Sequence, residues 1–399
     1  MTATAGPREG AGLPAPDADA RAHGERVAAH IGAAIAAAGG TLPFDRYMEL
    51  ALYAPGLGYY SAGSTKLGAA GDFVTAPELS PLFARCVARQ VEEILTAIRG
   101  GSVLEIGAGD GALAVELLSA LGRRDALPER YLIIERSAEL RARQADLLAE
   151  RLPALRDRIG WLDEMPAAGF AGVVLANEVL DAIPARRFRI NGRTIEEGRV
   201  EKNHGRFAWR YLAPTDPAWV RDVRAVIDPL DAPPASGYVS EIAPLRDAWV
   251  AGFGERLARG ALLLIDYGYP RREYYHPQRT DGTLMCHYRH RAHGDPLILA
   301  GLQDISVHVD FTAVALAAET VGLKVAGFTT QAEFLIACGV LDLASEWPPS
   351  DPAFLALAQQ LKTLLLPGQM GELIKVMALT RDLDVPLIGF GGRDLLGRL

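Results

Sequence analysis

The segment at residues 103–111, Val-Leu-Glu-Ile-Gly-Ala-Gly-Asp-Gly, constrains the fold more than any other part of this chain. The apolar residues at its start are typical of a strand that is covered on both faces of a sheet. The glycines that follow allow positive φ and let the backbone approach a ligand closely, and residues 112–121 continue as a predicted helix. A strand, a glycine-rich turn and a helix in this order predict an α/β unit that holds a nucleotide-like cofactor at the turn. A tight turn without a ligand is the alternative.

The spacing of the glycines narrows the type of cofactor site. The dinucleotide fingerprint is G-x-G-x-x-G, whereas here the glycines fall as G-x-G-x-G with a glutamate two places before the first. This pattern resembles the first motif of class I S-adenosylmethionine (SAM) methyltransferases. The resemblance implies a Rossmann-like α/β fold with a seven-stranded sheet and SAM as the cofactor. It also implies cofactor contacts from Glu105, Gly107, Ala108, Gly109 and Gly111.

Two later segments predict the next parallel strands. The apolar run at 131–134 ends at Glu135, and an acidic residue at the end of the second strand can accept both ribose hydroxyls of a nucleotide. A solvated carboxylate is the alternative for Glu135. Residues 160–163 could end the third strand, which would place Asp163 to accept a hydrogen bond from an adenine amino group.

Residues 172–177 predict a fourth strand that ends in a polar turn with Asn177, Glu178 and Asp181. Ligands of open α/β sheets bind outside the carboxyl ends of the strands. These three residues are therefore expected to meet a transferable methyl group and its acceptor. Asp181 could instead cap the following turn.

Six segments together resemble the MidA-like family, which includes the mitochondrial complex I assembly factor that methylates an arginine. The resemblance covers nearly the whole chain and implies a protein arginine methyltransferase that acts on a core subunit of complex I, with a homodimer possible. It also implies that Gly71, Asp72 and Phe73 help to complete the cofactor site. Ala108 and Ala243 depart from the family pattern, but neither removes a charged group. The matching segments are 58–61, 71–78, the glycine loop, 176–184, 265–268 and 304–311.

Methylation of an arginine requires the loss of a proton from a group whose pKa is above about 12. A carboxylate can hold the planar guanidinium with two hydrogen bonds and receive the proton as the methyl group arrives. Glu178 and Asp181, beside Asn177, are the first candidates, and Asp72 and Glu78 are the next.

A relay could take the proton onward from these carboxylates. His308 or Asp310 is the candidate for that step. A structural histidine between strands is the alternative for His308.

Composition and charge exclude several classes of protein. The 399 residues are 49% hydrophobic and carry a formal net charge of −8, as expected of a soluble enzyme. The arginines at 186–189 form the only concentrated basic run, so nucleic acid is not an expected partner. Three widely separated cysteines suggest neither a disulfide framework nor a zinc site. The histidines at 287, 290 and 293 are interpreted as part of an acceptor-binding loop, with no metal.

The N-terminal segment bears on localisation. Acidic residues among its arginines argue against a mitochondrial transit peptide, and no run of about 18 apolar residues predicts a membrane span. We therefore expect a cytoplasmic protein without direct membrane insertion.

Five regions are predicted along the chain. A disordered tail at 1–24 precedes a helical and loop region at 25–100 that completes the cofactor site. The SAM-binding core occupies 101–185 and 259–399, interrupted by a β-rich substrate region at 186–258 and by an insertion at about 269–311. A methyltransferase for small molecules or other proteins and a non-catalytic SAM-binding assembly factor remain as alternatives, since fold does not fix function.

Overall fold

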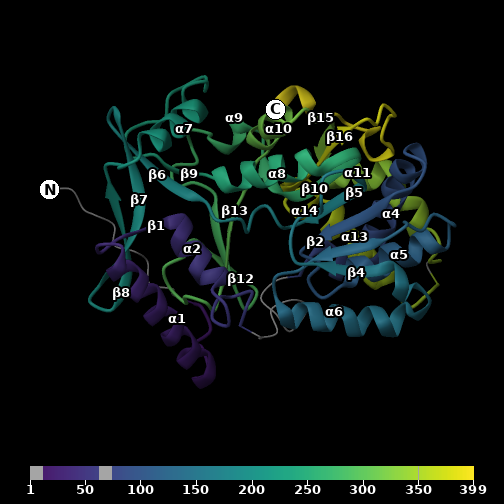
Figure 1. Cartoon of the computed structure of the whole chain (residues 1–399), viewed down its shortest axis with the longest axis horizontal. Coiled ribbons are helices and arrows are strands. Elements are labelled where there is room, and N and C mark those ends of the chain that lie inside the picture. Colours follow the sequence, from purple (N-terminus) through teal and green to yellow (C-terminus); the bar gives the residue numbers. More distant parts are fainter. Residues whose placement is uncertain (1–11, 63–73, 349) are drawn as a thin grey trace.

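The computed structural model describes residues 12–62, 74–348 and 350–399 as two lobes that lie side by side (Figure 1). One lobe contains the central sheet with helices on both faces. The other contains the N-terminal helices and, among the residues described, two smaller sheets. No helix in the described residues is long and apolar enough to cross a membrane.

The central sheet is mostly parallel. Across the described residues it runs β15-β16-β10-β5-β2-β3-β4, and β14 (Val309–Asp310) pairs with the end of β10. The five strands from β10 to β4 are parallel, and β16 is antiparallel to both of its neighbours. The seven strands of this path are β2 (Ser102–Ile106), β3 (Tyr131–Ile134), β4 (Ile159–Leu162), β5 (Phe170–Asn177), β10 (Leu257–Tyr269), β15 (Lys324–Thr330) and β16 (Ile374–Arg381). The fold class predicted from the sequence is confirmed.

Alternating residues of each strand pack against helices on opposite faces of this sheet. Val103 of β2 joins a core with α4 (Pro81–Ala97), α5 (Ala112–Gly122) and α6 (Ala138–Arg151). Leu104 joins a second core. That second core is covered by α8 (Pro244–Arg256) and α10 (Phe311–Thr320). The described helices between β15 and β16 are α11 (Gln331–Ala337), α12 (Val340–Ala344), α13 (Phe354–Leu365) and α14 (Met370–Leu373).

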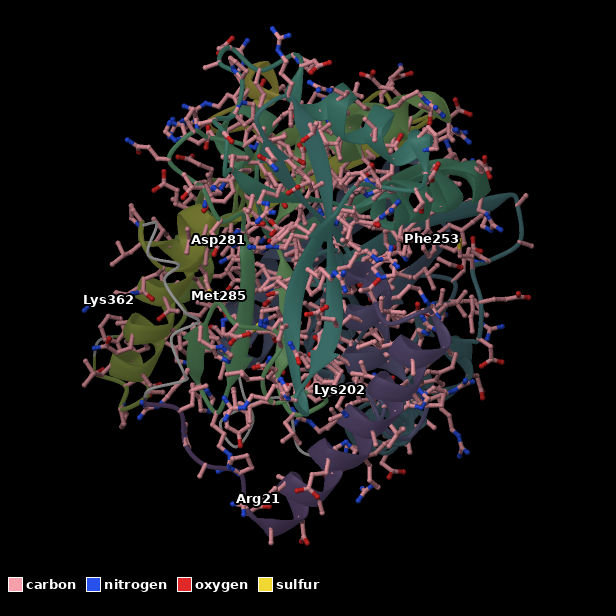
Figure 2. All side chains as sticks on the ribbon, turned by 90° about the vertical axis from the view of Figure 1, so that its left-hand side faces the viewer. Arg21, Lys202, Phe253, Asp281, Met285 and Lys362 are labelled. Atoms are coloured by element: carbon pink, nitrogen blue, oxygen red, sulfur yellow. The ribbon has the colours of Figure 1, made fainter. Side chains whose placement is uncertain are left out.

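The second lobe is assembled from three segments that lie far apart in the sequence. The N-terminal segment forms α1 (Ala18–Ala37), β1 (Leu42–Pro43) and α2 (Phe44–Tyr53). The segment after β5 forms β6 (Arg186–Asn191), β7 (Thr194–Asn203), β8 (Arg206–Leu212), α7 (Pro217–Ile227) and β9 (Val239–Ile242). The segment after β10 forms α9 (Arg271–Tyr274), β11 (Leu284–Tyr288), β12 (Arg291–His293) and β13 (Asp304–Val307). These strands form one sheet of β1, β7, β6, β9 and β8 and another of β12, β11 and β13. Side chains from all three segments share one hydrophobic core, with Tyr47, Phe188 and Ile305 as buried examples. Strand β7 also reaches α1, where Lys202 donates to the carbonyl of Ala28 at 3.1 Å (Figure 2).

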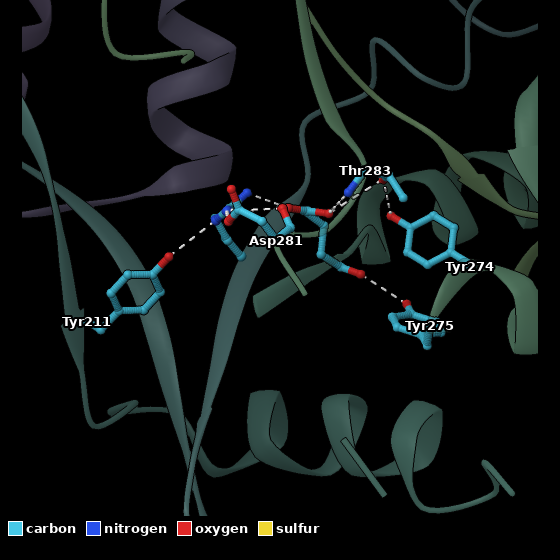
Figure 3. Close-up of polar contacts among 7 residues, drawn as sticks. Tyr211, Tyr274, Tyr275, Asp281 and Thr283 are labelled. Carbon is cyan, nitrogen blue, oxygen red and sulfur yellow. Dashed lines mark hydrogen bonds and ion pairs between the residues drawn. The ribbon is translucent and has the colours of Figure 1, made fainter. Parts of the chain in front are cut away.

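A buried ionic network joins two of these segments (Figure 3). Arg187 of β6 donates to Glu241 of β9 at 2.6 Å and also pairs with Asp281. Glu241 in turn accepts from the backbone N–H of Thr283 at 2.9 Å. Burial raises the pKa of Glu241 although Arg187 lies beside it. The network fixes the 274–283 segment against the β6–β9 sheet.

Two predicted boundaries are wrong. Residues 18–24, expected to be disordered, belong to α1, because Asp17 caps this helix and His23 bonds to the carbonyl of Leu57 at 2.8 Å. Helix α8, expected in the inserted β-rich region, packs on the central sheet because its apolar side faces α10 and β10. The hairpins expected around residues 187–211 are present as β6, β7 and β8.

Candidate active site

The glycine loop between β2 and α5 has a backbone that requires glycine. Gly107, Gly109 and Gly111 have φ values of 64°, 56° and 92°, in the left-handed region that other residues rarely adopt. A Cβ added to Gly107 would also lie 3.2 Å from Cγ2 of Val179. The loop thus leaves its backbone open at the carboxyl edge of the sheet, and Ala108 is buried within it.

Glu105 lies beneath this loop. Its carboxylate is 3% exposed and accepts a hydrogen bond from the Tyr131 hydroxyl at 2.6 Å. Burial raises the pKa of Glu105 to about 7. Glu105 therefore supports the loop from inside, and its contact with a cofactor stays a prediction.

Glu135 lies at the end of β3, as predicted, and is linked to the glycine loop by Gln144. The Gln144 amide donates to the carbonyl of Gly109 at 2.8 Å and to Glu135 at 3.2 Å, while Trp161 holds the Gln144 oxygen at 3.0 Å. Burial raises the pKa of Glu135. Sequence reasoning missed Gln144 and Trp161 because neither belongs to a motif.

Asp163, predicted to contact the adenine of the cofactor, is largely exposed to solvent. Its side chain is 86% exposed and forms an ion pair with Arg141 of α6. Its predicted adenine contact stays a prediction.

The polar turn after β5 is held by a residue that sequence reasoning did not assign. One oxygen of buried Asp266 accepts from the backbone N–H groups of Val179, Leu180 and Asp181 at 3.1, 2.8 and 3.3 Å. Its other oxygen accepts from the N–H of Tyr267 at 2.8 Å. An aspartate directly after a five-residue apolar strand was the signal that could have identified it. Asp266 orients the turn that carries the candidate catalytic carboxylates.

Glu178 has a strained backbone at this turn. Its φ is +52°, which is uncommon for a residue with a side chain, and its N–H donates to the carbonyl of Ile265 at 2.8 Å. One carboxylate oxygen accepts long hydrogen bonds from the Asn177 amide (3.2 Å) and from the N–H of Ala76 (3.4 Å), the first residue of α3 (Ala76–Leu79). The turn thus holds the Glu178 side chain at the carboxyl edge of the sheet.

Three carboxylates crowd together at this turn. Burial, with a smaller contribution from Asp266, raises the pKa of Glu178 to about 8. Burial also raises the pKa of Asp181 well above its usual range, and that of Asp266 to about 6. The positive charge of Arg246 lowers the pKa of Asp266 and so opposes part of this increase. Its guanidinium, however, donates to three backbone carbonyls, those of Leu180, Val307 and His308.

The second lobe contributes aromatic rings to the same edge. The hydroxyl of Tyr53 donates to the carbonyl of Ala182 at 2.9 Å, and that of Tyr60 donates to Asp304 at 2.7 Å. The two rings stack with centroids 5.5 Å apart. Asp304 is one of the charges that raise the pKa of Asp181. Tyr53, Tyr60 and Asp304 were not predicted as site residues, because their proximity arises from tertiary packing.

His308 lies between two other rings, with centroids 6.1 Å from Tyr267 and 5.3 Å from Tyr269. Its Nδ1 is buried and has no hydrogen-bond partner among the described residues. Burial, followed by the charges of Arg279 and Lys375, lowers the pKa of His308 to about 3. The imidazole is therefore neutral near pH 7.

Both carboxylate oxygens of Asp310 have partners within the fold, and its relay role stays a prediction. One of its oxygens caps α10 by accepting from the N–H groups of Thr312 (3.0 Å) and Ala313 (3.2 Å), and the other pairs with Arg271 at 3.2 Å. Because both oxygens are used within the fold, Asp310 is a helix cap. Asp-Phe-Thr at a helix start was a capping signal in the sequence.

The remaining candidates include a helix cap, a hairpin and residues outside the described ranges. Glu78 caps α3 by accepting from the N–H of Thr75 at 2.9 Å. The three histidines at 287, 290 and 293 lie on the β11–β12 hairpin. No group of three or more His, Cys, Asp or Glu side chains in the described ranges could hold a metal ion. Gly71, Asp72 and Phe73 lie outside the described residues.

Comparisons with known proteins fit this site. A family model for S-adenosyl-L-methionine-dependent methyltransferases matches residues 86–329. A protein from Burkholderia thailandensis, crystallised with bound S-adenosyl-homocysteine, is 45% identical with a TM-score of 0.92, covering 97% of this chain and 100% of that one. A second, native crystal structure from Burkholderia thailandensis is 44% identical with a TM-score of 0.89 at the same coverage.

Curated relatives are more distant. The mitochondrial protein arginine methyltransferase NDUFAF7 of Mus musculus is 28% identical over 385 residues, which cover 85% of this chain and 81% of that protein. SAM is therefore the cofactor, and contacts of its adenosine part with the glycine loop and Glu135 stay a prediction. The chain belongs to the family of S-adenosyl-L-methionine-dependent methyltransferases.

Proposed function

We propose that this enzyme methylates an arginine side chain of a protein, and that the protein is a core subunit of complex I whose assembly the methylation supports. The relatives named NDUFAF7 are protein arginine methyltransferases, and the chain spans about four-fifths of their length. The carboxyl groups at the polar turn after β5 supply the chemical support.

The observation that carries the proposal is a cluster of buried carboxyl groups whose ionisation requires a nearby cation. Glu178, Asp181 and Asp266 lie together, and the guanidinium of Arg246 is committed to backbone carbonyls. Such a group of carboxylates is unfavourable without a cation. The buried oxygen of Asn177 also lacks a donor among the described residues. A guanidinium provides both a positive charge and several N–H donors in one plane.

The reaction forms one bond between carbon and the guanidinium nitrogen and breaks the bond between that carbon and sulfur. Bound SAM supplies the electrophilic methyl group. Glu178 is placed to align the guanidinium, because its Oε2 accepts no hydrogen bond from the described residues. The same carboxylate can take the released proton, since its pKa of about 8 lies far closer to that of a methylated guanidinium than an ordinary carboxyl does.

Asp266 and Arg246 hold the backbone on either side of these groups, so the turn does not need to rearrange when the acceptor enters. Such preorganisation lowers the cost of positioning. Tyr53 and Tyr60 of the second lobe bond to Ala182 and Asp304, next to the turn that carries these carboxylates.

The test measures tritium transfer from labelled SAM to purified complex I core subunits, followed by mass spectrometry of the product. The proposal expects methylarginine on one subunit and no transfer when that arginine is replaced by lysine. Transfer to a small molecule alone, or binding of SAM and subunit without transfer, would contradict the proposal and support the alternatives.

The cytoplasm is our proposed location, although NDUFAF7 relatives are named mitochondrial. Fractionation of cells that express the tagged protein tests this point. Recovery with sealed mitochondria would overturn it.

A further inference from the structure

A cluster of positive charge lies beside the carboxylates, on the far side from the glycine loop. The guanidinium carbon of Arg279 is 4.4 Å from the ring centroid of Tyr269, and the Lys375 ammonium is 5.4 Å from the same ring. His308 meets that ring edge-on at 5.3 Å. These four residues are called the cationic cluster below.

Two members of the cluster have unused polar atoms. Within the described ranges, the buried Nε of Arg279 lacks a hydrogen bond, as does Nδ1 of His308. Buried polar groups without partners cost free energy, so their persistence in the fold calls for a ligand. A carboxylate could accept from the Nε–H and Nη–H of Arg279 together.

Lys375 adds positive charge to the cationic cluster, but backbone carbonyls already fix the position of its ammonium group. Its ammonium donates to the carbonyls of Glu372 and Leu373. Glu372 and Glu273 are the acidic groups that act on it, and Glu273 is paired with Arg398 at 2.9 Å. Four basic side chains act on His308 and lower its pKa. They are Arg279 before β11, Lys375 of β16, Arg246 of α8 and His287 of β11.

The order of strands gives the distance between the two charged regions. Along the carboxyl edge the order is β2 with the glycine loop, β5 with Glu178, β10 with Asp266, and β16 with Lys375. Lys375 is the register partner of Asp266. Neighbouring strands are about 4.8 Å apart, so the cluster lies roughly 5–10 Å beyond the carboxylates. Side chains one or two residues apart in an extended peptide span a similar distance, at about 3.4 Å per residue.

We propose that the cationic cluster is an anion subsite, which binds an aspartate or glutamate side chain that lies one or two residues from the arginine to be methylated. The pairing with arginine rests on the proposed function, whereas the anion subsite itself can be tested apart from it. The substrate class is then a protein segment with an arginine next to an acidic residue.

The first experiment tests the subsite by binding alone. The protein is saturated with S-adenosyl-homocysteine, and the imidazole signals of its histidines are followed by NMR, with His308 assigned by its loss in His308→Gln. The probe is N-acetylglutamate α-amide, and N-acetylglutamine α-amide is the uncharged control. The expected result is a His308 shift with the glutamate probe only, which Arg279→Gln abolishes and Arg272→Gln retains, since Arg272 is 73% exposed. Equal responses to both probes, or an unchanged response in Arg279→Gln, would overturn the proposal.

The second experiment tests the pairing by methyl transfer. Arginine peptides that carry glutamate or glutamine two residues from the arginine are compared by kcat/KM. One charge-assisted hydrogen bond predicts a preference of about tenfold or more for glutamate. Arg279→Gln should reduce that ratio to near one, while Arg279→Lys should restore part of it.

The outcomes separate the two proposals. Methylation of both peptides at the same rate refutes the acidic neighbour but keeps arginine as the acceptor. A selective NMR response without methylation of any arginine peptide supports the anion subsite and refutes arginine methylation.

Discussion

Replacement of Glu178 by glutamine tests the assignment of the catalytic carboxylate most directly. The amide keeps the size of the side chain and one oxygen for the long contacts with Asn177 and Ala76. It removes the negative charge from a turn where Asp181 and Asp266 are also buried. We therefore expect Glu178→Gln to fold and, near pH 8, to be more stable than the wild type.

The size of the catalytic effect has two parts. Loss of one charge-assisted hydrogen bond to the guanidinium costs about 1.5–3 kcal/mol. Loss of the proton acceptor costs about 100-fold or more in rate. Methyl transfer should thus fall by at least two orders of magnitude. SAM binding should change by only a few-fold, since the predicted adenosine contacts, Glu135 and the glycine loop, lie at the ends of β3 and β2, away from Glu178 at the end of β5.

The assay combines tritium transfer to the acceptor subunit with a calorimetric SAM titration of the same preparation. Glu346→Gln is the matched control, because Glu346 is 58% exposed and pairs with Arg85 away from the site. Transfer near the wild-type rate in a folded, SAM-binding Glu178→Gln protein would refute the role of this carboxylate. An equal loss in Glu346→Gln would show that the assay reports a general effect of the substitution.

Three further predictions concern the cofactor, the fold and pH. Glu135→Ala should weaken SAM by roughly 2–4 kcal/mol if the carboxylate accepts two ribose hydroxyls; a tenfold loss or less in calorimetry moves the ribose contact elsewhere. Glu241→Ala should lower the free energy of unfolding by about 3–5 kcal/mol, since it leaves buried Arg187 without one of its two carboxylate partners; urea unfolding that is unchanged contradicts this role. The raised pKa of Glu178, about 8, means that the ligand-free native state binds more protons than the unfolded chain, whose glutamates titrate near 4.3. The contribution of Glu178 to stability should therefore fall as pH rises from about 4.5 to about 8 and then level off. The measurement is the difference in unfolding free energy between the wild type and Glu178→Gln, and a difference that does not change over this interval argues against the shift.

The part of the site that the sequence predicts is the part that local patterns determine. The strand ends at 106, 134 and 177 follow from apolar runs, and parallel pairing brings Glu135, Glu178 and Asp181 to one edge. Their partners were not predictable in the same way. Tyr53 bonds to a carbonyl 129 positions away, and such a contact leaves no periodic signal.

The predictions for residues 18–24 and for Asp310 have related causes. Composition predicts disorder for residues 18–24 because it cannot register the contact of His23 with the distant loop at Leu57. Asp310 is predicted as a relay residue within the family-like segment at 304–311, whereas in the structure its position at a helix start makes it a cap.

The assembly of the second lobe from three distant segments has a consequence for synthesis on the ribosome. Tyr47 of α2 bonds to the carbonyl of Pro296, 249 positions later, so the apolar face of α2 emerges long before its partner exists. At about 5–20 residues per second, that interval is roughly 10–50 seconds. During it, Phe44 and Tyr47 need a chaperone or a temporary fold, and the methyl-transfer site cannot form. A nascent chain therefore stays inactive until Asp304 has left the exit tunnel and met Tyr60.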